Sequence, residues 1–250
     1  MPPQVDAAQP PEASSRHRIP GVIPGSLRKR LSSWHPGRDR RWRRLPGIQR
    51  IAGARAVLTF DDGPGEDATP LVLDELRRLG AHGTFFLLGA EVRLKPELAR
   101  EILAGGHELG LHGFAHPRYD KLAPKQARRD LELGLEVIEA ETGVRPRWFR
   151  PPFGRMSEDS HAICRSLGLD IAYWSSWGLD WEETDADAIF AAVAPDLHPG
   201  AIVLLHDTAR YGRRASAEPT ASALPAIVEC ARRRGLKWVT LSEGAGEETA

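Results

Sequence analysis

The stretch Arg-Ala-Val-Leu-Thr-Phe-Asp-Asp-Gly-Pro, residues 55–64, decides the fold. Its first six residues form a short apolar run, as expected for a strand that is buried on both faces of a parallel sheet. Two adjacent carboxylates and a Gly-Pro turn follow directly. A buried strand that ends in acidic residues is typical of α/β proteins, whose active sites lie at the carboxyl ends of parallel strands.

Further short apolar runs recur along the chain, separated by stretches with helical periodicity. Besides 55–60, we expect strands at 83–88, 107–111, 147–150, 170–174, 201–205 and 237–240. We expect helices at 69–80, 96–105, 124–142, 157–167, 185–197 and 219–234. This alternation predicts a parallel sheet with right-handed crossovers, and both an open doubly wound sheet and a closed barrel fit it.

The composition excludes several classes of protein. The chain has 250 residues, no net charge and two cysteines. Cys164 and Cys230 are too few for a disulfide scaffold or a cysteine-rich zinc module, so we expect both to be buried. No strand leads into a glycine motif for dinucleotides or phosphates, which argues against nucleotide-binding enzymes. No apolar run reaches the roughly 18 residues that a membrane span needs.

The first fifty residues differ from the rest. Residues 1–50 contain 11 Lys and Arg against 3 Asp and Glu, and eight of the twenty prolines. We predict a largely disordered basic tail here, followed by one domain at 51–245. Nucleic-acid binding by the folded domain is not expected, although the tail could contact a membrane surface. The tail lacks the apolar segment of a secretory signal, so we expect a cytoplasmic protein.

Polar residues follow most of the predicted strands. Because parallel strands share one carboxyl-terminal face, these residues are expected to converge. Two histidines and a carboxylate are a common ligand set for a catalytic divalent metal. Of two adjacent carboxylates, one can bind the metal while the other stays free as a base. The residues concerned are Asp61, Asp62, His112, His116, Arg150, Asp180 and His206.

Taken in order, these residues resemble the five motifs of the polysaccharide deacetylases, the NodB-homology proteins of carbohydrate esterase family 4. The resemblance covers about residues 53–243 and implies a distorted (β/α)7 barrel. The motifs are Thr59-Phe-Asp-Asp-Gly-Pro64, His112-x-x-x-His116, Arg150-Pro-Pro-Phe153, Leu179-Asp-Trp181 and Leu204-Leu-His-Asp207.

The resemblance implies a role for each matching residue. Asp62, His112 and His116 would bind a divalent metal, zinc or cobalt. Asp61 would be the general base that activates the attacking water, and His206 the general acid that protonates the leaving amine.

Five further residues would support this chemistry. The resemblance implies that Arg150 orients Asp61 and that Asp180 does the same for His206. Trp181 and Leu204 would line the pocket for the acetyl methyl group. The backbone near Phe153 would help to hold the oxyanion.

The chain departs from the family pattern at three positions. Gly113 stands where the family has Ser or Thr, a hydroxyl that commonly steadies the loop between the two histidines. We therefore expect a lower metal affinity. Trp177 replaces an Asp, and Phe153 replaces a Tyr. None of these changes removes a ligand, the base or the acid, so we expect an active enzyme.

The expected activity is metal-dependent hydrolysis of the N-acetyl group of a sugar, oligosaccharide or polysaccharide, chitooligosaccharide- or peptidoglycan-like, with release of acetate. One alternative is a metal-dependent hydrolase of a formamide, a cyclic amide or an O-acetyl ester. Another is a non-catalytic carbohydrate-binding module. We also hypothesise that Arg210, Arg213 and Arg214, just after His206, contact an anionic group of the substrate.

Overall fold

A computed structural model describes residues 45–246 of the chain. At its centre lies strand β1 (Arg55–Asp61), whose last six residues are buried. Along one edge β1 pairs in parallel with β7 (Ala201–His206). Its other edge pairs with β8 (Lys237–Trp238) near its start and with β2 (Gly83–Leu87) further along. The apolar run predicted at 55–60 is thus the central strand of the sheet.

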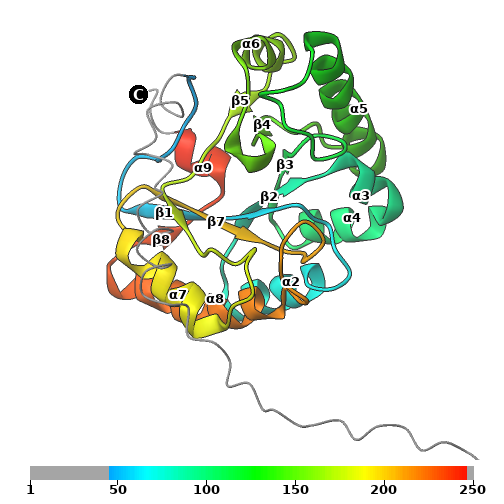
Figure 1. Ribbon diagram of the computed structural model, residues 1–250. Helices are drawn as coiled ribbons and strands as arrows, with labels where there is room; N and C mark the ends of the chain where they lie inside the picture. The colour runs from blue at the N-terminus through cyan, green and yellow to red at the C-terminus, as the bar shows by residue number, and fades with distance from the viewer. Residues whose placement is uncertain (1–44, 247–250) are drawn as a thin grey trace, which may run out of the picture. The chain divides into compact units, whose positions relative to one another are not determined.

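The sheet continues on both sides of β1 in the order β5-β4-β3-β2-β1-β7-β6, and all neighbouring strands are parallel. The chain passes from β5, at one end of this order, to β6, at the other, through four residues. Figure 1 shows the strands in the middle and the helices around them. This curled parallel sheet confirms the predicted barrel type. The remaining strands are β3 (Glu108–Leu111), β4 (Trp148–Phe149), β5 (Asp170–Ile171) and β6 (Ser176–Trp177).

The predicted helices begin and end within one residue of the expected bounds, except that the helix expected at 185–197 ends at Val193 and continues as a 3-10 turn. A proline in the first turn opens α2, α4 and α5, and left-handed glycines end α2 (Gly80, φ 56°) and α5 (Gly143, φ 73°). The helices are α2 (Thr69–Leu79), α3 (Gly89–Leu94), α4 (Pro96–Ala104), α5 (Pro124–Thr142), α6 (Glu158–Ser166), α7 (Ala186–Val193), α8 (Glu218–Arg233) and α9 (Leu241–Ala245), with 3-10 turns η2 (Pro152–Gly154) and η3 (Ala194–Asp196).

Three elements were not predicted: α3, α9 and β6. The two helices have six and five residues, too few for a periodic pattern to show. The run 170–174, predicted as one strand, leaves the sheet after Ile171, and the chain then pairs with β7 as β6. The sequence could not show this change of neighbour, because no residue of the stretch indicates which strand it will pair with.

Residues 45–50, the end of the predicted tail, lie against the sheet. The Ile48 N–H donates to the Ile171 carbonyl, and the Ile48 carbonyl accepts from the Tyr173 N–H. The rest of the predicted tail, 1–44, lies outside the described residues. Cys164 and Cys230 are both buried and unbridged, as predicted. In the described part of the chain, no helix has the length and apolar character to cross a membrane.

Candidate active site

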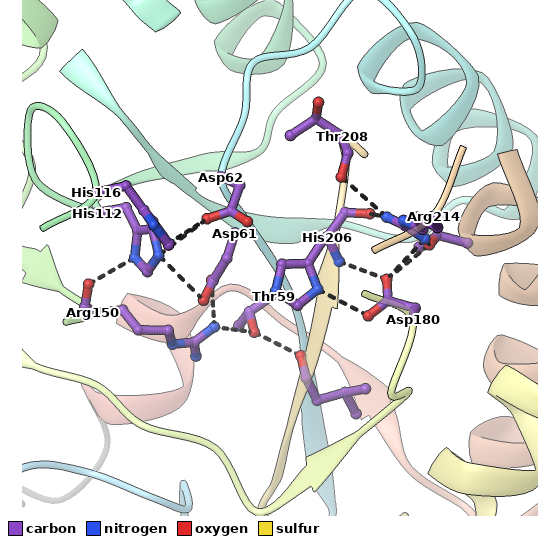
Figure 2. A network of polar contacts seen from close by, with 12 residues as sticks. Thr59, Asp61, Asp62, His112, His116, Arg150, Asp180, His206, Thr208 and Arg214 are labelled. Carbon is purple, nitrogen blue, oxygen red and sulfur yellow. Dashed lines mark hydrogen bonds and ion pairs between the residues drawn. The ribbon is translucent and has the colours of Figure 1, made fainter. Parts of the chain in front are cut away.

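The fold brings the predicted site residues together at the carboxyl ends of the central strands (Figure 2). Asp61 ends β1 and His206 ends β7, and the strand register places them directly opposite each other. His112 follows β3 immediately, and Arg150 follows β4. The expected convergence follows from the parallel order of the strands.

One group contains the three predicted ligands, Asp62, His112 and His116. Asp62 Oδ1 lies 3.3 Å from His112 Nε2 and 3.2 Å from His116 Nε2. This oxygen is buried and has no hydrogen-bond partner among the described residues. One ligand atom from each residue lies within 4.8 Å of the others. An orphaned carboxylate oxygen facing two imidazole nitrogens fits a divalent metal ion.

Neighbouring groups favour the binding of a cation by these three side chains. His112 Nδ1 lies 2.7 Å from the Arg150 carbonyl, and since a carbonyl only accepts, the proton sits on Nδ1 and leaves Nε2 free to bind. Burial opposes ionisation of Asp62, but His112, His116 and His206 hold its pKa well below the usual range. Asp62 and His116 both adopt positive φ angles, 77° and 59°. Such strained backbone is common at functional sites.

The neighbouring carboxylate, Asp61, is held separately. Its Oδ1 accepts a hydrogen bond of 2.8 Å from Arg150 Nη1, while its Oδ2 lies 4.0 Å from His112 Nε2. Arg150 is fully buried. It also donates to the Thr59 hydroxyl (2.6 Å) and the Tyr173 carbonyl (2.9 Å), so its guanidinium is fixed in place. Arg150 thereby orients Asp61 so that its Oδ2 points toward His112, one of the three predicted ligands.

On the other side, His206 is paired with the buried carboxylate of Asp180. His206 Nδ1 lies 2.9 Å from Asp180 Oδ1, and the His206 backbone N–H donates to Asp180 Oδ2 over 2.8 Å. Burial alone would lower the pKa of His206, but Asp180, helped by Asp62 and Asp61, raises it to about 9. The imidazole is therefore protonated at neutral pH.

The three predicted lining residues also lie near these groups. The Trp181 ring packs edge-on against His206, with centroids 5.7 Å apart. Leu204 is buried in β7, two residues before His206. Phe153 has a positive φ of 57° and is 52% exposed, and its ring lies 4.7 Å from that of His116.

The loop between the two histidines has an anchor that the sequence did not reveal. Gly113 has φ +97°, and a Cβ there would lie 2.7 Å from the Tyr119 hydroxyl and 2.9 Å from Asp130 Oδ1. A serine or threonine does not fit. Instead Asp130, on α5, accepts hydrogen bonds from the N–H groups of Phe114 (2.9 Å) and Ala115 (3.2 Å) and from Tyr119. Because Asp130 holds this loop, a glycine at position 113 does not by itself imply the lower metal affinity expected from the sequence.

Asp130→Ala should weaken metal binding by about 10- to 100-fold, as is usual when a residue that orients the ligands is lost. The substitution removes the acceptor for two loop N–H groups and the Tyr119 hydroxyl. Competition against a chromophoric chelator would measure the dissociation constant for zinc. Asp120→Ala is the matched control, because Asp120 pairs with Arg118 and, in the described structure, forms no hydrogen bond or ion pair with residues 113–116. Equal affinities of the folded variant and wild type would contradict this anchoring role.

Other nearby residues were missed or assigned differently from the sequence. The Tyr211 ring lies 4.6 Å from that of His116, and no motif marks it. Asp207 is buried, accepts from the Thr69 hydroxyl (2.6 Å) and has a pKa raised by burial to about 7. A side chain at Gly63 would collide with its carboxylate. Arg214, hypothesised to meet an anionic substrate group, is buried and bound to the protein's own oxygens.

Comparisons with known proteins point to one family. A sequence model of the family described as polysaccharide deacetylase matches residues 51–172. The chitooligosaccharide deacetylase of Bradyrhizobium sp. (strain ANU 289) is 35% identical over 201 residues, which cover 75% of this chain and 89% of that protein. The peptidoglycan-N-acetylglucosamine deacetylase PgdA of Listeria monocytogenes is 32% identical over 194 residues, 78% of this chain but only 39% of PgdA.

A solved structure shows the same fold. It is a mutant, with restored enzymatic activity, of BA3943, a pseudoenzyme of carbohydrate esterase family 4 from Bacillus anthracis. The TM-score is 0.73 at 29% identity, covering 80% of this chain and 71% of that one. Sequence relatives and fold together show that this chain belongs to the polysaccharide deacetylase family, the deacetylases of carbohydrate esterase family 4.

Proposed function

We propose that this chain hydrolyses the N-acetyl group of an N-acetylated oligosaccharide or polysaccharide, with release of acetate. The observation that carries the proposal is the position of Asp61 and His206. They lie opposite each other at the ends of adjacent strands, and each is held by its own buried partner of opposite charge. Amide hydrolysis needs a base and an acid that are separate groups with different protonation states.

Asp62, His112 and His116 would hold a divalent cation, zinc or cobalt. When bound, such a cation lowers the pKa of water and polarises a carbonyl. Asp61 Oδ2 takes the proton of the attacking water, while Arg150 keeps this carboxylate oriented.

The attack breaks the amide bond once the leaving nitrogen is protonated. His206 Nε2 supplies that proton, because Asp180 occupies Nδ1. Trp181 and Leu204 offer apolar surface for the acetyl methyl group, and the backbone near Phe153 would help to hold the developing oxyanion. The products are acetate and a free amine.

The substrate class rests on the relatives, which are named for chitooligosaccharide and for peptidoglycan N-acetylglucosamine. Likeness to a pseudoenzyme shows that the fold alone does not determine activity. What favours activity here is the presence of the base, the acid and the three ligands together. The cytoplasmic location expected from residues 1–50 remains a prediction, as does contact of that tail with a membrane.

The test is acetate release from N-acetylated chitooligosaccharides by zinc- or cobalt-loaded protein. We expect release that stops after removal of the metal with a chelator and returns when the metal is added back. Loss of a catalytic metal removes both water activation and carbonyl polarisation, worth several kcal/mol of barrier. A metal-loaded protein that liberates a different acid, or cleaves only O-acetyl esters, would refute N-deacetylation and favour the alternative hydrolase.

A further inference from the structure

Arg214 lies beside Asp180, on the side away from the three predicted metal ligands (Figure 2). Its side chain is only 2% exposed. Nη1 donates to the Thr220 hydroxyl over 2.7 Å, and Nη2 donates to the carbonyls of His206 (3.1 Å) and Thr208 (3.2 Å). The guanidinium thus donates hydrogen bonds to the backbone carbonyls on both sides of Asp207.

The same guanidinium reaches the carboxylate that orients His206. Arg214 Nη1 lies 3.6 Å from Asp180 Oδ2, and the Thr220 hydroxyl bridges them with a hydrogen bond of 2.8 Å to that oxygen. Oδ2 also accepts the His206 backbone N–H. A buried carboxylate needs compensating charge and donors. Asp180 receives both, from His206 on one side and from Arg214 and Thr220 on the other.

Two carboxylates of the site, Asp61 and Asp180, therefore each lie beside a buried arginine. Asp61 is held by buried Arg150, and Asp180 by buried Arg214. Arg150 belongs to a recognised motif, whereas Arg214 lies beyond the last one. Its hydrogen-bond acceptors lie nearby in the chain, at His206, Thr208 and Thr220, whereas Asp180 is distant in sequence.

We infer that Arg214 is a positioning residue for the proposed general acid: it fixes His206 through Asp180 and through the end of β7. This inference rests on the proposed function. Without Arg214, the His206 and Thr208 carbonyls and the Thr220 hydroxyl lose a donor, Asp180 loses a nearby cation, and the imidazole is free to shift. A displacement of about 1 Å of a reacting group can cost on the order of 10²-fold in rate.

A surface cavity gives experimental access to this position. It has a volume of about 620 Å³, and its lining includes Arg214, Thr208 and Ala215. In Arg214→Ala the deleted guanidinium would leave a gap that opens into this cavity. Free guanidinium ion could enter from solvent and restore the hydrogen bonds.

The experiment compares wild type, Arg214→Ala and Arg233→Ala on an N-acetylated chitooligosaccharide. Arg233 is an exposed arginine on α8, paired with Glu229, and serves as the matched control. We expect Arg214→Ala to lose about 10- to 100-fold in kcat, with KM changed less than about threefold. Millimolar guanidinium chloride should restore much of the loss, whereas equal sodium chloride should not. Zinc affinity should stay at the wild-type value, since Asp62, His112 and His116 do not contact Arg214.

Several results would overturn the inference. One is a wild-type kcat in folded Arg214→Ala. Another is a loss that guanidinium does not rescue, or that accompanies weaker zinc binding, since either assigns Arg214 a general structural role. If Arg214→Ala does not fold, Arg214→Lys decides the question. Its ammonium keeps the charge but cannot reach all acceptors together, so a wild-type kcat there overturns the inference and a reduced kcat with wild-type KM supports it. Wild-type protein without deacetylase activity would instead refute the proposed function.

Discussion

Asp61→Asn is expected to lower kcat for deacetylation by about 10²- to 10⁴-fold, with KM changed little, because a general base contributes on this scale. The substitution suits the site for a structural reason. The amide keeps an oxygen that can accept the 2.8 Å hydrogen bond from Arg150 Nη1. The buried guanidinium also keeps its bonds to Thr59 and Tyr173. What is lost is the ability to take a proton from water.

Three measurements make this result interpretable. Zinc content should equal that of wild type, because the proposed ligand carboxylate is Asp62 rather than Asp61. The thermal midpoint shows whether the buried guanidinium tolerates a neutral partner. Asp74→Asn, a substitution in an exposed ion pair with Arg77 on α2, should keep wild-type activity. Residual activity above about one tenth of wild type, in a folded and zinc-loaded Asp61→Asn, would remove Asp61 from the role of base.

His206→Ala is expected to lower kcat on N-acetyl amides by about 10²- to 10⁴-fold, yet to spare esters with good leaving groups. An amine leaves only when its nitrogen is protonated. A nitrophenolate leaves without a proton, so p-nitrophenyl acetate does not need the acid. Assaying both substrates with both variants separates the role of base from that of acid. Asp61→Asn should lower kcat on the amide and on the ester, whereas His206→Ala should lower kcat on the amide alone.

The pH profile gives a second readout of His206. Because its pKa is raised to about 9, the proton is present below that pH and lost above it. Wild-type deacetylation should therefore decline on the alkaline side near pH 9, whereas ester cleavage should show no such decline. If His206→Ala slows both substrates equally, the residue does not act as the acid for the leaving group.

The main elements could be predicted from the sequence because their signals are local. The apolar run before Asp61 predicts a buried strand, and Pro124 and Gly143 bracket the longest helix. The site residues follow from strand ends and ordered motifs. Asp130 and Tyr211 could not be found in this way, and Arg214, singled out by its place after His206, was expected to contact the substrate instead of Asp180. Each touches the site only through the tertiary fold: Asp130 through the loop after β3, Tyr211 through a ring contact with His116, and Arg214 through Asp180.

The pairing of Asp61 with His206 across β1 and β7 affects how proteins with this fold can diverge in evolution. Neighbouring strands are held about 4.8 Å apart by their ladder of hydrogen bonds. The spacing of Asp61 and His206, the two residues proposed to transfer protons, is thus set by the sheet and does not depend on any loop. Trp181, Phe153 and Tyr211 lie in the loops that follow the strands. Insertions in these loops can change which substrates enter the site without changing the distance between Asp61 and His206. Substrate range and reaction chemistry can therefore change independently in descendants of one ancestor.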